Sequence, residues 1–141
     1  MEIYELKAEL KELRRLNATI NSRIDAHEKY TSRLSYLEQV GMVDSNEYKA
    51  VKRNMDKINA VDLIRREAEL ESKYIDYFNN LSQLKRSIAI DWYIKAKPIY
   101  KIQSAYTIDR DSVYVRLTEI RMEIFRKVGL DSKELNVRAM K

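Results

Sequence analysis

Residues that interrupt helices are almost absent from this chain of 141 residues. It contains only two glycines, Gly41 and Gly129, and a single proline, Pro98. These are too few turn residues to separate the strands of a β-sandwich, and the abundant Leu, Ile, Glu, Lys, Arg and Ala favour helices. We therefore expect an all-α fold. Gly41 and Gly129 are expected to close helices and Pro98 to open one, because glycine suits a helix C-cap and proline suits a first turn.

Residues 2–40 carry a heptad repeat. One row of its positions holds Ile3, Leu10, Asn17, Ile24 and Thr31, and the other holds Leu6, Leu13, Ile20, His27 and Leu34. This spacing predicts one helix of about 58 Å with a coiled-coil seam. The seam is strongest over residues 3–24, which predicts an oligomerisation surface made of Leu6, Leu10, Leu13, Asn17, Ile20 and Ile24.

A second long helical segment follows Gly41. Asp44 or Ser45 is expected to cap it, and it either runs unbroken to about Leu81 or breaks near Asp76–Asn80. The seam of the first helix is therefore covered either by this segment folded back or by the same helix of another chain. We predict a helical hairpin over residues 1–80, a second domain over 81–130 and a basic tail over 131–141.

The positive charge is concentrated in the second part of the chain. Residues 1–84 hold 14 Lys and Arg against 15 Asp and Glu, a balance of −1, whereas residues 85–141 hold 13 against 7, a balance of +6. A basic C-terminal part predicts a polyanionic partner, and the alternative is a merely solvated basic surface.

The sequence lacks the residue patterns of most enzymes. It has no cysteine and one histidine, His27, which we expect to pack in the seam rather than to bind a metal. No glycine-rich phosphate loop, catalytic triad or metal-spaced cluster occurs, so we expect neither catalysis nor a cofactor. The charged N-terminus and the lack of an apolar run of about 18–20 residues predict a cytoplasmic protein that does not span a membrane.

From Leu81 onward the apolar positions predict three shorter helices. They cover about 82–96, a short stretch opened by Pro98, and about 110–128, with Asp109 as the cap of the last. In this last helix one stripe is apolar and consists of Val113, Leu117, Ile120, Ile124 and Val128. Two helices joined by a short turn and preceded by a third match the helix-turn-helix plan.

Several residues of the last helix lie outside that stripe. We expect its first turns to enter the major groove of DNA through Arg110, Ser112, Tyr114, Val115, Arg116 and Thr118. Lys97, Lys101 and Arg121 would add contacts to phosphates. Trp92, Tyr93, Tyr100 and Tyr106 are expected to pack in or near the core rather than to stack on bases.

The stretch RSIAIDWYIKAKPIYKIQSAYTIDRDSVYVRLTEIRMEIFRKV resembles the fourth region of sigma-70-type factors, including the recognition-helix pattern at Val113, Arg116 and Leu117. The resemblance covers roughly residues 82–130. The ArpU and RinA late-gene activators of phages of Gram-positive hosts are similar in size and organisation. This chain departs from the pattern at two places: it has Gln103 and Ser104 where a small alanine is usual, and its turn is Thr107-Ile108-Asp109 without the common glycine.

The resemblance implies a phage-encoded transcriptional regulator that binds double-stranded DNA in the host cytoplasm and acts on late genes. A homodimer is favoured because two recognition helices bind paired half-sites better than one. The alternatives are a monomer acting beside RNA polymerase and a non-enzymatic adaptor that holds another protein through its coiled coil.

Overall fold

The computed structural model describes residues 1–57 and 61–139, with side chains at 1–54 and 63–132. This part of the chain contains helices and no strand, so the expected all-α class is confirmed. The elements are α1 (Ile3–Gln39), α2 (Asn46–Lys57), α3 (Val61–Asn79), α4 (Gln83–Ala89), the π-helical turn η1 (Ile90–Ile94), α5 (Ile99–Tyr106) and α6 (Arg110–Ala139). Within these ranges no helix has the length and apolar character that crossing a membrane requires.

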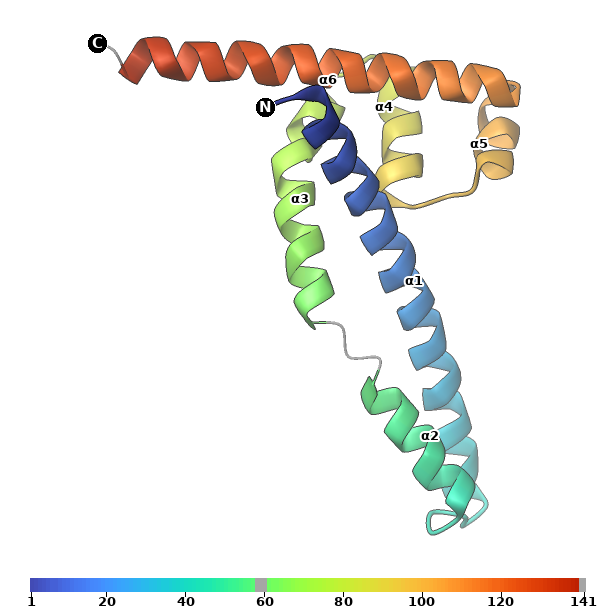
Figure 1. Ribbon diagram of the computed structural model, residues 1–141. Coiled ribbons are helices and arrows are strands. Elements are labelled where there is room, and N and C mark those ends of the chain that lie inside the picture. The colour runs from blue at the N-terminus through green and yellow to red at the C-terminus, as the bar shows by residue number, and fades with distance from the viewer. Residues whose placement is uncertain (58–60, 140–141) are drawn as a thin grey trace.

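The long helices form a hairpin capped by a crossbar (Figure 1). Helix α1 runs antiparallel to α2 and then α3, and α6 lies across the open end of this hairpin, with α4 and α5 beneath one half of α6. As expected, Gly41 follows the first helix, and its φ of 73° is the left-handed conformation that glycine adopts easily. Of the two expected caps of α2, Ser45 acts: its Oγ accepts the Tyr48 N–H at 3.1 Å.

The second long segment is described as two helices. Residues 58–60, between these two helices, lie outside the described residues. Helix α3 ends at Asn79. The structure therefore has the expected break near Asp76–Asn80 rather than an unbroken helix to Leu81.

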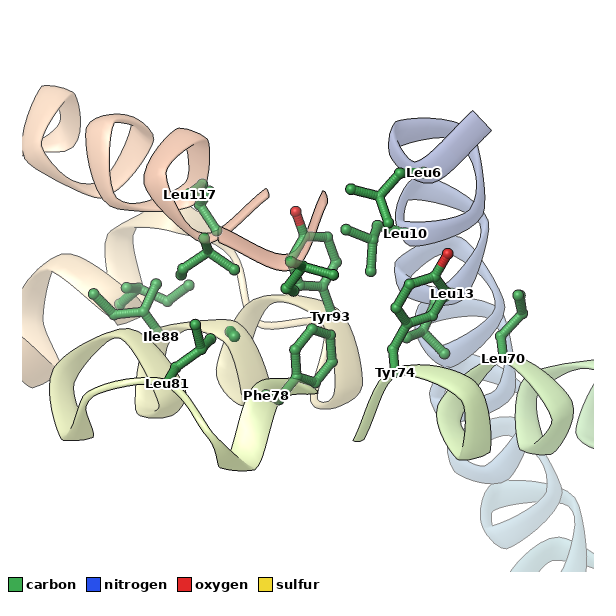
Figure 2. Packing of buried hydrophobic residues seen from close by; sticks show 14 of the residues in the cluster. Leu6, Leu10, Leu13, Leu70, Tyr74, Phe78, Leu81, Ile88, Tyr93 and Leu117 are labelled. Atoms are coloured by element: carbon green, nitrogen blue, oxygen red, sulfur yellow. The ribbon is translucent and has the colours of Figure 1, made fainter. Parts of the chain in front are cut away.

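One buried hydrophobic cluster joins both halves of the chain (Figure 2). Its members come from α1, α3, α4, η1, α5 and α6, and include Leu6, Leu10, Leu13, Leu70, Tyr74, Phe78, Ile88, Tyr93, Ile102, Leu117 and Ile120. Phe78 and Tyr93 stack at its centre, with ring centroids 5.7 Å apart. Burial of each such side chain contributes about 1.5–3 kcal/mol, so this cluster holds the hairpin and the C-terminal helices together across residue 80.

The heptad seam is covered along only part of α1. Leu6, Leu10 and Leu13 are fully buried within this single chain and Asn17 is 9% exposed, but Ile24 is 51% exposed. Ile20 lies between these extremes. The chain thus fills the leucine positions assigned to oligomerisation with its own helices, which favours the hairpin over a second chain at this seam.

The last helix is longer than expected. The prediction that Gly129 closes it near residue 128 is wrong, because α6 continues to Ala139 and includes most of the expected tail. A glycine inside a helix costs only about 1 kcal/mol relative to alanine, so it does not by itself end one. Beyond it, the Tyr77 hydroxyl of α3 donates a hydrogen bond to Asp131 Oδ2 at 2.7 Å and holds the extended part of α6.

Candidate nucleic-acid interface

A tight turn fixes α5 against α6. Pro98 precedes the first turn of α5, as expected, and Thr107 ends this helix with a φ of 53°. Thr107, in the turn that lacks the expected glycine, thus adopts the left-handed conformation. A β-branched residue there costs about 1–2 kcal/mol, so the packing of the two helices must impose it.

Asp109 caps α6, as predicted. Its Oδ1 accepts the backbone N–H of Ser112 at 2.7 Å. This hydrogen bond to the charged form lowers the pKa of Asp109. Asp111 adds negative charge in the first turn, where the helix dipole favours it. The start of α6 is therefore set by local interactions.

The expected inward stripe of α6 is confirmed. Val113, Ile120 and Ile124 are completely buried and Leu117 is 1% exposed. Val128, at the end of the stripe, is partly buried against the same cluster. The opposite side of the first turns is consequently turned away from the core.

Four of the predicted DNA-binding residues lie together on that outer side. Arg110 and Thr118 are exposed, Tyr114 is 42% exposed and Val115 is 53% exposed. The Arg110 guanidinium lies 5.7 Å from the centre of the Tyr114 ring. Thr118 Oγ1 donates to the Tyr114 carbonyl at 3.0 Å, which leaves its lone pairs able to accept. Ser112 is half-buried beside them.

Two other predicted residues are paired with carboxylates. Arg116 lies on another flank of α6, where it bonds Glu119 at 3.0 Å, and Lys85 of α4 approaches the same carboxylate at 3.6 Å. The Arg116 hydrogen bond is the main cause that lowers the pKa of Glu119. Lys97 pairs with the buried Asp91 at 3.4 Å. The structure thus does not bring Arg116 together with Arg110 and Tyr114.

Neither Lys101 nor Arg121 forms an ion pair with a carboxylate in the described part of the chain. Lys101 is exposed and forms no ion pair within the described part of the chain. Arg121 donates to the Tyr93 hydroxyl at 3.4 Å and to Thr118 Oγ1 at 3.3 Å, both neutral partners. Arg121 therefore links the outer face of α6 to η1.

Arg121 also lines a groove of about 550 Å³ between α1, η1 and α6. The other lining residues come mostly from the first helix and are Lys7, Lys11, Arg14, Arg15, Ala18, Trp92 and Tyr93. The α1 cations were not expected at this interface, because the charge balance of residues 1–84 is near zero. Lys7, Lys11 and Arg15 lie four residues apart, or about one helical turn, and this spacing could have indicated that they share one face of the helix.

Polar side chains of α1 hold this groove together. Arg14 Nη1 donates to the carbonyls of Trp92 at 2.6 Å and Lys97 at 3.0 Å, and its guanidinium stacks 3.4 Å from the Trp92 ring centre. Burial lowers the pKa of Arg14. Asn17 Nδ2 donates to the Tyr93 carbonyl at 3.1 Å. Asn17, which was assigned to the oligomerisation surface, therefore fastens α1 to the π-helical turn.

The aromatic residues follow the expectation in part. Tyr93 is 2% exposed, Trp92 lies beneath Arg14, and the hydroxyl of the half-buried Tyr106 donates to Asp91 Oδ2 at 2.6 Å. Tyr100 is 65% exposed, so its expected packing role is wrong. It occupies the first turn of α5 on the side away from Ile102, the buried residue of that helix.

Among the side chains described at residues 1–54 and 63–132, no group of three or more acidic or histidine residues is arranged to hold a metal ion. Comparison of the sequence with family models and curated proteins, and of the fold with solved structures, gave no match. The function of this face must therefore be inferred from its own geometry and charge.

Proposed function

We propose that this protein is a sequence-specific double-stranded DNA-binding transcriptional regulator without catalytic activity, and that the first turns of α6 read the major groove. One observation carries the proposal. On these turns Arg110, Tyr114, Val115 and Thr118 face solvent, while Val113 and Leu117 face the core. An α-helix fits the major groove, which is about 12 Å wide, and its N-terminal residues reach base edges first.

Each exposed residue has a chemical role in the proposal. Arg110 bonds the O6 and N7 acceptors of guanine, and Val115 contacts a thymine methyl group. Thr118 and Tyr114 bond bases or phosphates through their hydroxyls, and Lys101 contacts phosphate. Arg116 and Lys97 have smaller roles, because Glu119 and Asp91 already neutralise them.

The resemblance to sigma-type and late-gene activators supports a phage-encoded regulator of late genes in the host cytoplasm, with RNA polymerase as a further partner. A homodimer would bind paired half-sites. Because Leu6, Leu10 and Leu13 are buried within one chain, a dimer through the N-terminal helices would use the uncovered middle of α1 around Ile24.

The proposal is tested by selecting bound sequences from a random duplex pool, with light scattering to count chains. Arg110→Ala should reduce discrimination among sequences, since one bidentate base contact contributes about 1–3 kcal/mol. Lys101→Ala should weaken binding to all sequences about equally. Lys29→Ala is a matched charge control, because Lys29 is exposed on the distant half of α1. Retention of full discrimination by Arg110→Ala would show that another face reads the bases.

A second function is favoured by a different observation. Val115 and Met122 of α6 are 53% and 50% exposed and lie seven residues apart on one side of the helix. This apolar strip suits a protein partner such as RNA polymerase, as in an adaptor. In that case duplexes would not be retained at about 50–100 mM salt, and a pull-down would recover a stoichiometric partner.

A further inference from the structure

The N-terminal half of α1 separates its charges onto two flanks. On one flank the carboxylates are paired with α3: Glu9 bonds Lys73 at 2.9 Å and Glu12 bonds Arg66 at 3.1 Å. The other flank carries Lys7, Lys11 and Arg15, which line the groove described above. The near-neutral balance of this segment therefore hides a strongly basic strip.

The cations of this strip have no partners of their own. The side chains of Lys7, Lys11 and Arg15 are exposed and make no ion pair or hydrogen bond to any residue that the structure describes. No carboxylate lines the groove, which also contains Arg14 and Arg121. Five positive side chains held around one groove repel one another, and an anion bound there would relieve that repulsion.

The groove is held rigidly at the side of the proposed reading face. Arg14 fixes α1 to the backbone carbonyls of Trp92 and Lys97, so it acts as a positioning residue. Arg121 bonds Thr118, one of the exposed residues of the first turns of α6.

The spacing of the cations indicates an extended anion. Lys7, Lys11 and Arg15 follow one another at four-residue intervals, which is a rise of about 6 Å per step along the helix. A row of this kind suits successive phosphates of a strand better than a single small anion. Trp92 is covered by Arg14 and is not available to stack on a base.

We propose that the basic strip of α1 binds the phosphate backbone of the same DNA duplex whose major groove α6 enters. This inference rests on the proposed function and deepens it, because it assigns the N-terminal helix to the DNA interface. Lys7, Lys11 and Arg15 are the phosphate contacts, Arg121 joins the strip to the reading face, and the strand runs along the groove beside η1.

The test compares the full-length protein with the triple variant Lys7→Ala/Lys11→Ala/Arg15→Ala. The probes are a duplex carrying the sequence preferred in the selection and a random duplex of equal length. Since each phosphate contact contributes about −0.9 to the slope of log K against log salt, the variant's slope should be less negative by about 2–3. Its affinity for both duplexes should fall at least about tenfold, while the preferred sequence stays unchanged, because phosphate contacts do not specify bases.

Lys29→Ala is the control, since this exposed lysine of α1 lies 18 residues beyond Lys11, or about 27 Å. It should leave the affinity and the salt slope unaltered. Equal thermal midpoints for the triple variant and the parent verify that the fold is intact; Lys11→Glu alone, at an exposed site, is the substitute if the triple variant unfolds early.

The possible outcomes separate the two proposals. If the parent binds the duplex and Arg110→Ala impairs discrimination while the triple variant keeps the parental salt slope, the role of α1 is overturned and the proposed function stands. If the parent binds no duplex, both are overturned. Loss of affinity by the triple variant for the preferred duplex alone would also contradict a backbone contact.

Discussion

The N-terminal part and the middle of α1 share one heptad pattern but have different surroundings. In the first half, Leu6, Leu10 and Leu13 are completely buried by α3 and the C-terminal helices. In the middle of α1, Ile24 belongs to the same heptad row as Leu10 and is half exposed. A heptad repeat thus specifies which face of a helix can pack, whereas the tertiary arrangement decides where that face is covered.

The largest expected effect comes from truncating one leucine in the covered N-terminal part of α1, with truncation of one isoleucine in its uncovered middle as the contrast. Leu10→Ala should lower the free energy of unfolding by about 2–5 kcal/mol, because it leaves a cavity in a sealed core. Ile24→Ala should change it by less than about 0.5 kcal/mol. Urea denaturation of both variants measures the contrast. Equal losses would mean that the middle of α1 is covered in solution, for instance by a second chain.

A smaller effect is expected for a buried carboxyl group of α3. Glu67 of α3 is 9% exposed, and its Oε1 has no hydrogen-bond partner in the described chain. Burial, and then the neighbouring Glu71, raises the pKa of Glu67 to about 7. Because this pKa lies above the ordinary value of 4.5, folding is accompanied by proton uptake between these two pH values. Stability should therefore fall as pH rises from about 4.5 to about 7 and be constant above that, with a loss on the order of 2 kcal/mol.

Glu67→Gln should remove this pH dependence and make the protein more stable than the parent at about pH 8. Glu69→Gln is the matched control. Glu69 is on the same helix, but it is exposed and paired with Arg66. Unfolding curves measured across the pH range compare the two variants. A parental pH dependence in Glu67→Gln would show that another group is responsible.

The smallest effect concerns an uncovered stretch of the other long helix. A Cβ added to Gly129 of α6 would meet no atom within 4 Å, so intrinsic helix propensity alone should decide the result. Gly129→Ala should stabilise the protein by about 0.5–1 kcal/mol. Gly41→Ala provides the opposite case, because its φ of 73° is unfavourable for alanine and the change should destabilise. Thermal unfolding distinguishes the two signs.

Features that depend on neighbouring residues could be predicted from the sequence. The caps at Ser45 and Asp109, the end of the first helix at Gly41 and the inward stripe from Val113 to Ile124 all follow from local chemistry and periodicity. The end of α6 could not be predicted in this way, because Gly129 is tolerated and Tyr77, from a different helix, bonds Asp131 beyond it.

The candidate site was predictable only on its α6 side. The exposed positions of Arg110, Tyr114 and Val115 follow from helical geometry once the buried stripe is known. Arg14 lies 78 residues from its partner Trp92, and no periodicity relates such distant segments. In the charge balance of residues 1–84, the acidic flank of α1 offsets its basic flank. The balance therefore gave no sign of the basic strip at Lys7 and Lys11.

The stacking of Phe78 on Tyr93 beneath the leucines of α1 has a practical consequence. An excised fragment that began at residue 81 would leave Tyr93 without the ring of Phe78 and would lose the guanidinium that satisfies the carbonyls of Trp92 and Lys97. We therefore expect the C-terminal helices to be less stable when the N-terminal hairpin is removed.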